Sequence, residues 1–162
     1  MPASSPSADG PGRGGGWVAA QFVLLAAVAL SAIVGLGWTG LWLHVAIAVA
    51  GVLGAVGLVL VVGGSLGLGS AMTPFPRPRE GGRLIVEGLY AHARHPIYGG
   101  VLLLSVAWSL AFASIAGAIF TVALAVLFVF KSRREEEWLV ERYPRYAEYR
   151  ARVRRRFLPF LL

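Results

Sequence analysis

The chain has 162 residues, of which 57% are hydrophobic and only 14% charged, and its mean hydropathy is +0.69. Soluble domains average about 25% charged residues, so this composition excludes an ordinary water-soluble protein, and the length suits one domain. The chain has no Cys, which excludes disulfides, thiolate nucleophiles and Cys-ligated metals.

Residues 1–16 are rich in Ser, Pro and Gly, and we expect them to be disordered. The hydrophobic stretch that follows is too long for a signal peptide and lacks a convincing cleavage site. We expect residues 17–162 to form a single membrane domain.

A tract without Lys, Arg, Asp or Glu runs from Trp17 to Pro76. One crossing of a bilayer takes roughly 20 helical residues, so this tract is long enough for two. A turn-like cluster at Gly37–Gly40 divides it. We predict transmembrane helices near 17–36 and 41–67.

The basic residues are placed on one side of this pattern. Arg77, Arg79, Arg83 and Arg94 follow the first tract, and most of the other Lys and Arg residues come after Phe130. The positive-inside rule then predicts that the N-terminus, the central loop and the C-terminal tail are cytoplasmic. A plasma (inner) membrane is the simple expectation for such a protein. Topology and anionic lipid explain the net charge of +7 without a nucleic-acid partner.

The central loop ends in a segment, Gly88–Gly100, that combines aromatic, basic and small residues. Pro96 suits the first turn of a helix, which places Arg94 and His95 at a helix N-terminus, where an anion is favoured. Tyr98 follows about one turn later, near the same face. An interfacial anchor would use the same residue types, so binding and anchoring both stay open here.

Histidines occur twice in this segment, at His92 and His95. Metal sites usually add a carboxylate or Cys close to such a pair, and none lies nearby. We therefore predict no metal site.

A second uncharged tract runs from His95 to Phe130 and would measure about 50 Å as one helix, which is too long for one span. Its natural bend is at Ala113–Gly117. We predict a hairpin of transmembrane helices near 97–113 and 115–131. The predicted fold is therefore all-α and integral to the membrane, with four transmembrane helices.

The predicted cytoplasmic tail, 132–162, opens with the carboxylates Glu135, Glu136 and Glu137. They could hold hydroxyl or ammonium groups of a ligand. They could equally stabilise a helix, either through i,i+4 pairs with Lys131 and Arg133 or through a new helix capped by Ser132.

Further along the tail, Tyr146, Tyr149, Val153 and Phe157 recur at helical spacing. We predict an amphipathic helix that lies on the membrane or covers the hairpin, with this stripe used for packing. Pro144 separates it from the preceding helix.

The combination of these motifs resembles one known family. Its parts are Gly88-x-Tyr90-x-x-x-Arg94-His95-Pro96-x-Tyr98-x-Gly100, a hydrophobic hairpin, Glu135-Glu136-x-x-Leu139 and Tyr143-x-x-Tyr146-x-x-Tyr149. Together they are similar to the isoprenylcysteine carboxyl methyltransferase and phospholipid methyltransferase superfamily of integral membrane enzymes. The resemblance covers roughly residues 70–160.

The resemblance implies an S-adenosylmethionine-dependent methyltransferase that acts on a lipophilic small molecule or lipid. The acceptor could be an isoprenylcysteine-like carboxylate or a lipid amine, thiol or hydroxyl. The implied catalytic residues are Arg94, His95 and Tyr98, and the implied cofactor-binding residues are Tyr90, His92, Arg94, His95, Pro96, Tyr98, Gly100, Glu135 and Glu136.

Two other functions stay open at this stage. A small membrane scaffold would use the basic tail to bind anionic lipid or a partner. A reductase-like protein would bind NADPH, because sterol reductases resemble the same superfamily in their C-terminal part. The oligomeric state also stays open, since small-residue patterns such as Gly51-x-x-Gly54-x-x-Gly57 serve packing within or between chains.

Overall fold

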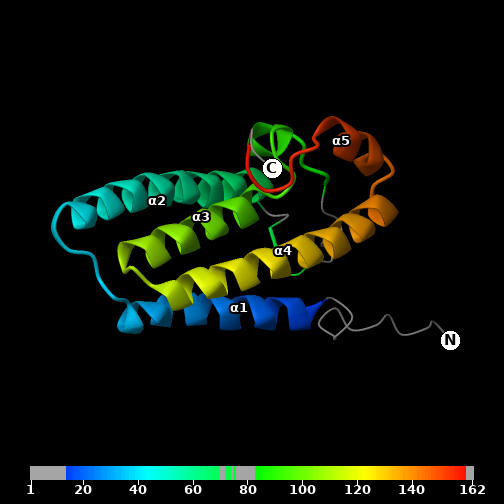
Figure 1. Cartoon of the computed structure of the whole chain (residues 1–162). Helices are drawn as coiled ribbons and strands as arrows, with labels where there is room; N and C mark the ends of the chain where they lie inside the picture. The colour runs from blue at the N-terminus through cyan, green and yellow to red at the C-terminus, as the bar shows by residue number, and fades with distance from the viewer. Residues whose placement is uncertain (1–13, 70–71, 74, 76–82, 160–162) are drawn as a thin grey trace.

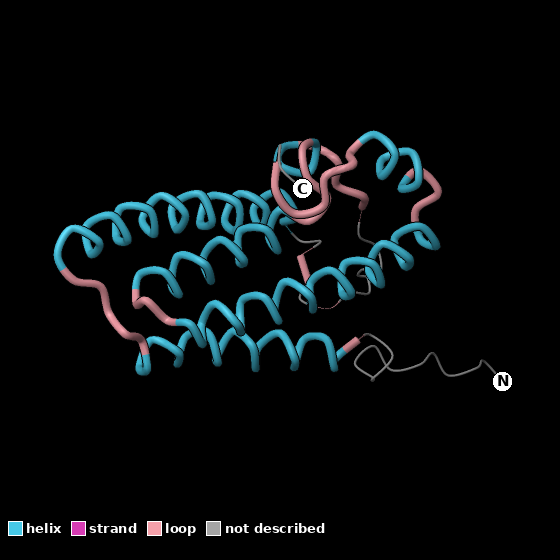
Figure 2. Tube along the Cα trace, viewed as in Figure 1, coloured by secondary structure: helices cyan, strands magenta, loops and turns pink. Residues whose placement is uncertain are grey.

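The computed structural model describes residues 14–69, 72–73, 75 and 83–159, and every regular element among them is helical. In chain order they are α1 (Gly15–Leu30), the 3₁₀ turn η2 (Ser31–Val34), α2 (Gly40–Leu68), the 3₁₀ turn η4 (Gly88–Ala91), α3 (Pro96–Ala111), α4 (Ile115–Arg142) and α5 (Tyr146–Arg152). Helices α1 to α4 form a bundle, and η4 and α5 lie over one end of it (Figures 1 and 2). The all-α prediction is confirmed for this part of the chain.

Three helical segments are long and apolar enough to cross a membrane: Gly15–Val34, Gly40–Leu68 and Ile115–Arg142. The remaining apolar helix, α3, has 16 residues and is therefore about 24 Å long, against a hydrocarbon core of about 30 Å. The fourth span stays a prediction.

The helix boundaries follow the apolar pattern closely at α2, which extends one residue beyond the predicted range 41–67 at each end. The first predicted helix, 17–36, is divided, because α1 ends at Leu30 and η2 continues to Val34. Of the N-terminal segment predicted to be disordered, residues 1–13 lie outside the described part of the chain, and α1 already begins at Gly15.

Helix α4 differs most from its prediction. It does not stop at residue 131 but continues without a break to Arg142, so the tail carboxylates lie on the same helix as the apolar span. No helix starts at Ser132, whose hydroxyl instead donates to the Val129 carbonyl at 3.0 Å. The physical reason is that charged side chains do not interrupt a helix, whereas Pro144 does.

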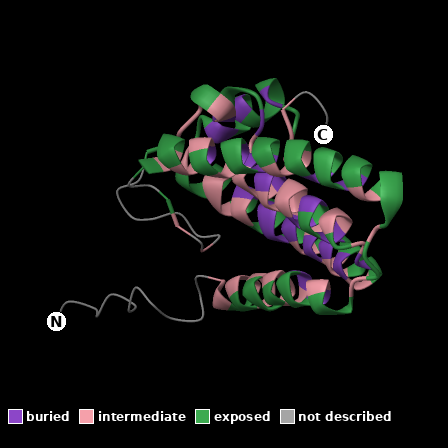
Figure 3. Ribbon diagram, turned by 90° about the vertical axis from the view of Figure 1, so that its left-hand side faces the viewer, coloured by how far each residue is buried: buried purple, intermediate pink, exposed green. Residues whose placement is uncertain are grey.

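Large apolar side chains cover much of the outside of the bundle. Ile33 is 80% exposed, Leu36 78% and Leu41 75%. Figure 3 shows buried positions in the middle of the bundle and exposed positions along its outer helices. Such surfaces are stable in hydrocarbon and unfavourable in water, which fits helices that face lipid.

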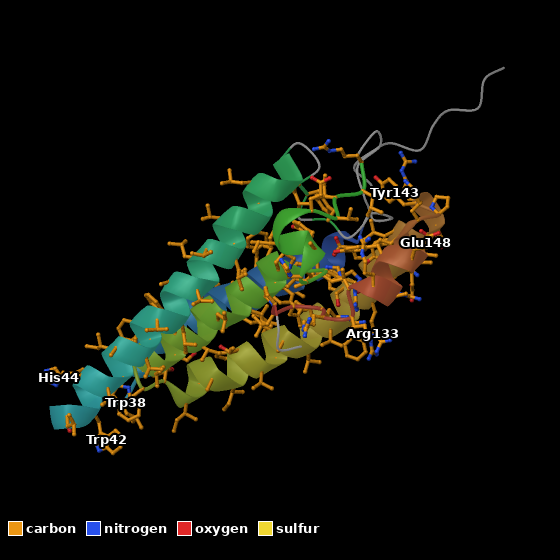
Figure 4. The ribbon with its side chains drawn as sticks, turned by 90° about the horizontal axis from the view of Figure 1, so that it is seen from above. Trp38, Trp42, His44, Arg133, Tyr143 and Glu148 are labelled. Atoms are coloured by element: carbon orange, nitrogen blue, oxygen red, sulfur yellow. The ribbon has the colours of Figure 1, made fainter. Side chains whose placement is uncertain are left out.

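The two ends of the bundle differ in chemistry. Figure 4 shows its labelled side chains in two groups, with Trp38, Trp42 and His44 at one end and Arg133, Tyr143 and Glu148 at the other. Arg133, Tyr143 and Glu148 belong to the tail that the sequence predicted to be cytoplasmic.

The predicted amphipathic tail helix is shorter than expected. Tyr146 and Tyr149 are buried in α5, but the helix ends at Arg152. Val153 is buried just beyond it, and Phe157 lies in the irregular segment that follows, with its ring centroid 6.4 Å from that of His95. The start of the stripe packs as predicted. Beyond Arg152 the chain is no longer helical, and the carbonyls of Arg155 and Arg156 accept hydrogen bonds from the backbone just before α3.

Candidate active site

The C-terminal segment crosses directly over the start of helix α3. The backbone N–H of Arg94 donates to the Arg155 carbonyl at 3.0 Å, and that of His95 donates to the Arg156 carbonyl at 2.7 Å. His95 is the N-cap residue of α3 and Arg94 directly precedes it, so these two N–H groups beside the predicted anion-favouring helix end already have carbonyl acceptors within the chain.

The side chain of Arg94 strengthens the same connection. Its Nη1 donates to the carbonyls of Val153 at 2.6 Å and Arg154 at 2.8 Å, while its Nε donates to Glu136 Oε1 at 2.9 Å. The planar guanidinium thus joins helix α4 to the C-terminal segment. Arg94 holds helix α4 and the C-terminal segment together, and its Nε and Nη1 already have acceptors.

Replacing Arg94 by Lys is expected to loosen residues 153–157, because one ammonium group cannot reproduce the directed contacts of a guanidinium. We expect a loss of roughly 1–2 kcal/mol of stability. Hydrogen–deuterium exchange should show faster exchange in this segment, with helix α2 unchanged as the internal control. Unchanged exchange at 153–157 would contradict the positioning role.

Glu136 is the buried centre of this network, with 3% of its surface exposed. Besides Arg94, its Oε1 lies 3.1 Å from His95 Nε2 and 3.5 Å from Arg156 Nε. A buried carboxylate is stable only when paired and hydrogen-bonded in this way.

Glu135, one residue earlier, has a different environment. Its Oε2 accepts a hydrogen bond from the Tyr98 hydroxyl at 2.9 Å and lies 3.7 Å from His95 Nδ1. The Tyr98 ring stacks on His95 and on Phe128, at centroid distances of 5.4 Å and 4.5 Å. The stacked rings fix the tyrosine, which in turn orients the carboxylate.

A cavity of about 380 Å³ lies beside Glu135. It is lined by Gln21, Phe22, Leu68, Met72, Thr73, Leu84, Ile85, Tyr90, Arg94, His95, Ile97, Tyr98, Lys131, Glu135, Leu139, Tyr146 and Tyr149. Its wall therefore combines apolar side chains from α1 and the end of α2 with polar ones from α3, α4 and α5. Small-molecule sites typically have volumes of roughly 300–1,000 Å³.

The structure brings most of the predicted site residues to this cavity: Tyr90, Arg94, His95, Tyr98 and Glu135 all line it. The other four lie elsewhere. Glu136 is buried next to it, Pro96 begins α3, His92 is exposed, and Gly100 faces helix α2. Within the described residues there is no group of three or more potential metal ligands.

Sequence reasoning missed five polar residues of the cavity: Gln21, Thr73, Lys131, Tyr146 and Tyr149. Lys131 is 1% exposed, its Nζ donates to Gln21 Oε1 at 2.5 Å, and the same Nζ lies 5.2 Å from the centre of the Tyr98 ring. A polar residue isolated in an apolar helix, as Gln21 is in α1, was the available signal.

Two tyrosines that line the cavity, Tyr90 and Tyr149, are held in place by hydrogen bonds to backbone carbonyls. The Tyr149 hydroxyl donates to the Tyr90 carbonyl at 2.6 Å, and the Tyr90 hydroxyl donates to the Gly64 carbonyl at 3.3 Å. Burial raises the pKa of Tyr149 to about 12, so this hydroxyl stays a donor at neutral pH. The two bonds connect α5 through η4 to α2.

A family model described as phospholipid methyltransferase matches residues 45–146. The chain belongs to this family. It is thus an integral membrane protein of a methyltransferase family, as the resemblance of its motifs predicted. A comparison with curated proteins gave no match. The matched segment contains every predicted site residue from Tyr90 to Glu136, whereas α1, which supplies Gln21 and Phe22, lies outside it.

Proposed function

We propose that the protein transfers a methyl group from S-adenosylmethionine to a lipophilic acceptor at the cytoplasmic face of a plasma (inner) membrane. The observation that carries this proposal is the cavity at the end of the apolar bundle, in which the oriented carboxylate of Glu135 meets an apolar wall. Membership of the phospholipid methyltransferase family supports the reaction class.

The residues of the cavity fit such a cofactor chemically. The Glu135 carboxylate could accept hydrogen bonds from ribose hydroxyls or from an ammonium group. Lys131 could donate to a carboxylate, and the rings of Tyr98 and His95 offer apolar faces nearby. The cavity volume of about 380 Å³ is sufficient for a small cofactor.

Bound S-adenosylmethionine supplies a methyl group on a sulfonium, which is already activated for transfer. The protein has to orient the reacting groups in line and keep them there. In this proposal, Tyr98 and His95 hold Glu135 in place. Arg94 and Glu136 hold the C-terminal segment over the site.

A lipophilic acceptor fits the apolar part of the wall. Phe22 of α1, Leu68 of α2 and Met72 just beyond α2 are among the apolar lining residues of the cavity. An acyl or prenyl chain in the bilayer could pack there with its polar head near Glu135. A carboxylate acceptor needs no general base, whereas an amine, thiol or hydroxyl would first have to lose a proton.

Calorimetric titration of the detergent-purified protein with S-adenosylhomocysteine tests the proposal, with NADPH as the parallel ligand. We expect saturable one-site binding of the homocysteine compound and none of NADPH. Glu135→Ala should weaken binding roughly 10-fold or more, because it removes a charged hydrogen-bond acceptor. Glu137→Ala, at an exposed position paired with Arg134, should leave binding unchanged.

A folded protein that binds neither ligand would overturn the proposal and favour a membrane scaffold. Saturable binding of NADPH alone would favour a reductase-like function instead.

A further inference from the structure

Tyr146 differs from the other tyrosines of the C-terminal cluster in one respect. The residue is only 2% exposed, so its hydroxyl is shielded from water. This hydroxyl nevertheless has no hydrogen-bond partner among the described residues. Tyr146 also lines the cavity. Buried hydroxyl groups nearly always have a partner, because an unpaired one loses its hydrogen bonds to water and gains nothing.

Packing alone explains the ring of Tyr146 but not its hydroxyl. The ring belongs to a buried cluster with Tyr149 and Val153, at a centroid distance of 5.5 Å from the Tyr149 ring. A phenylalanine would fill the same space. The other unsatisfied buried atom, Arg156 Nε, lies 3.5 Å from Glu136 Oε1 in an ion pair, whereas the Tyr146 hydroxyl has no hydrogen-bond partner among the described residues.

We propose that Tyr146 is a ligand-binding residue whose hydroxyl donates a hydrogen bond to an oxygen of the cofactor bound in this cavity. The inference rests on the proposed function and adds a residue that the sequence pattern assigned to packing. Burial, aided by the nearby Glu136 carboxylate, raises the pKa of Tyr146 well above its usual value. The hydroxyl therefore keeps its proton and acts as a donor at neutral pH.

The oxygen could belong to the carboxylate of the cofactor's amino-acid end or to its ribose. Both accept a hydrogen bond from a phenol, and they differ in strength, since bonds to charged groups are roughly twice as strong. Two ligands separate them: S-adenosylhomocysteine carries both groups, and methylthioadenosine carries only the ribose.

The test is Tyr146→Phe, titrated with both ligands in the full-length protein. We expect affinity for S-adenosylhomocysteine to fall about 10-fold for a bond to ribose, and further for a bond to the carboxylate. Weakened binding of both ligands would assign the ribose. Weakened binding of S-adenosylhomocysteine alone would assign the carboxylate.

Two further tyrosines provide controls. Tyr143→Phe changes a tyrosine that packs against the same cluster without lining the cavity, and it should leave affinity unchanged. Tyr149→Phe removes a hydroxyl that has a partner, so it should lower the thermal unfolding midpoint. Tyr146→Phe should leave that midpoint unchanged or raise it, because no bond within the protein is lost.

Equal affinity of wild type and Tyr146→Phe for S-adenosylhomocysteine would overturn this inference and leave the proposed function standing. A drop in the unfolding midpoint of Tyr146→Phe equal to that of Tyr149→Phe would also overturn it, since the hydroxyl would then have a structural partner. No binding by the wild type would overturn the proposed function itself.

Discussion

Replacing Glu136 by Ala is expected to cost about 3–5 kcal/mol of stability, because it leaves the buried Arg94 guanidinium without its carboxylate. The same change removes the contact to His95 Nε2 at 3.1 Å and the charge that faces Arg156. The C-terminal segment is bonded to Arg94 and His95, which line the cavity, so loss of its anchor should also abolish the proposed cofactor binding. We expect the variant to purify in lower yield and to unfold at a clearly lower temperature.

Thermal unfolding midpoints in one detergent would measure this effect. Glu137→Ala is the matched control, because Glu137 is the next residue on α4, 57% exposed in its side chain, and its ion pair with Arg134 lies at the surface. Exposed pairs contribute about 1 kcal/mol or less. Glu136→Gln keeps the size and one oxygen acceptor and should fall between the two. Equal midpoints for Glu136→Ala and Glu137→Ala would show that the buried network contributes nothing.

The different roles of adjacent glutamates could not be predicted from the sequence. Glu135, Glu136 and Glu137 are one run of identical residues, and helical geometry turns each by about 100° from the last. The direction of each side chain depends on where α3 and the C-terminal segment lie. Those neighbours are distant in sequence. The run of glutamates therefore indicated a site but not which glutamate has which role.

The helices themselves were predictable because hydrophobicity is a local property of the chain. The range expected for α2 differed from the observed helix by one residue at each end. The error at α4 arose from taking a change from apolar to charged residues as the end of a helix. Composition marks where a helix leaves the bilayer, and breakers such as Pro144 mark where it ends.

The cavity residues missed by sequence reasoning share one cause. Gln21 and Lys131 are 110 positions apart and meet only because α1 packs along α4. Tyr146 belongs to an apolar stripe whose spacing correctly indicated burial, and its unpaired hydroxyl is a property of the folded surroundings. Membership of a pocket formed by distant elements leaves no pattern in any one segment.

Gly100 shows the reverse case, a residue that the resemblance assigned to the cofactor site and that faces another helix. A Cβ atom on Gly100 would stand 2.6 Å from the Gly57 carbonyl oxygen and 2.9 Å from the Val61 backbone nitrogen. Both are backbone atoms of α2, which cannot move as a side-chain end can. A close crossing of this kind, with small residues at the contact, is typical of packed membrane helices.

Gly100→Val is therefore expected to force α2 and α3 apart. We expect it to lower the free energy of unfolding by at least about 3 kcal/mol, because a clash with backbone atoms costs more than a clash with a movable side chain. Gly51→Val is the control: a Cβ at Gly51 of α2 meets no atom within 4 Å, so the larger side chain would face outward. Thermal unfolding midpoints should fall for the first variant and stay near wild type for the second. If Gly100→Val kept its midpoint and lost only S-adenosylhomocysteine binding, the glycine would serve the cofactor site, as the resemblance implies, rather than the helix crossing.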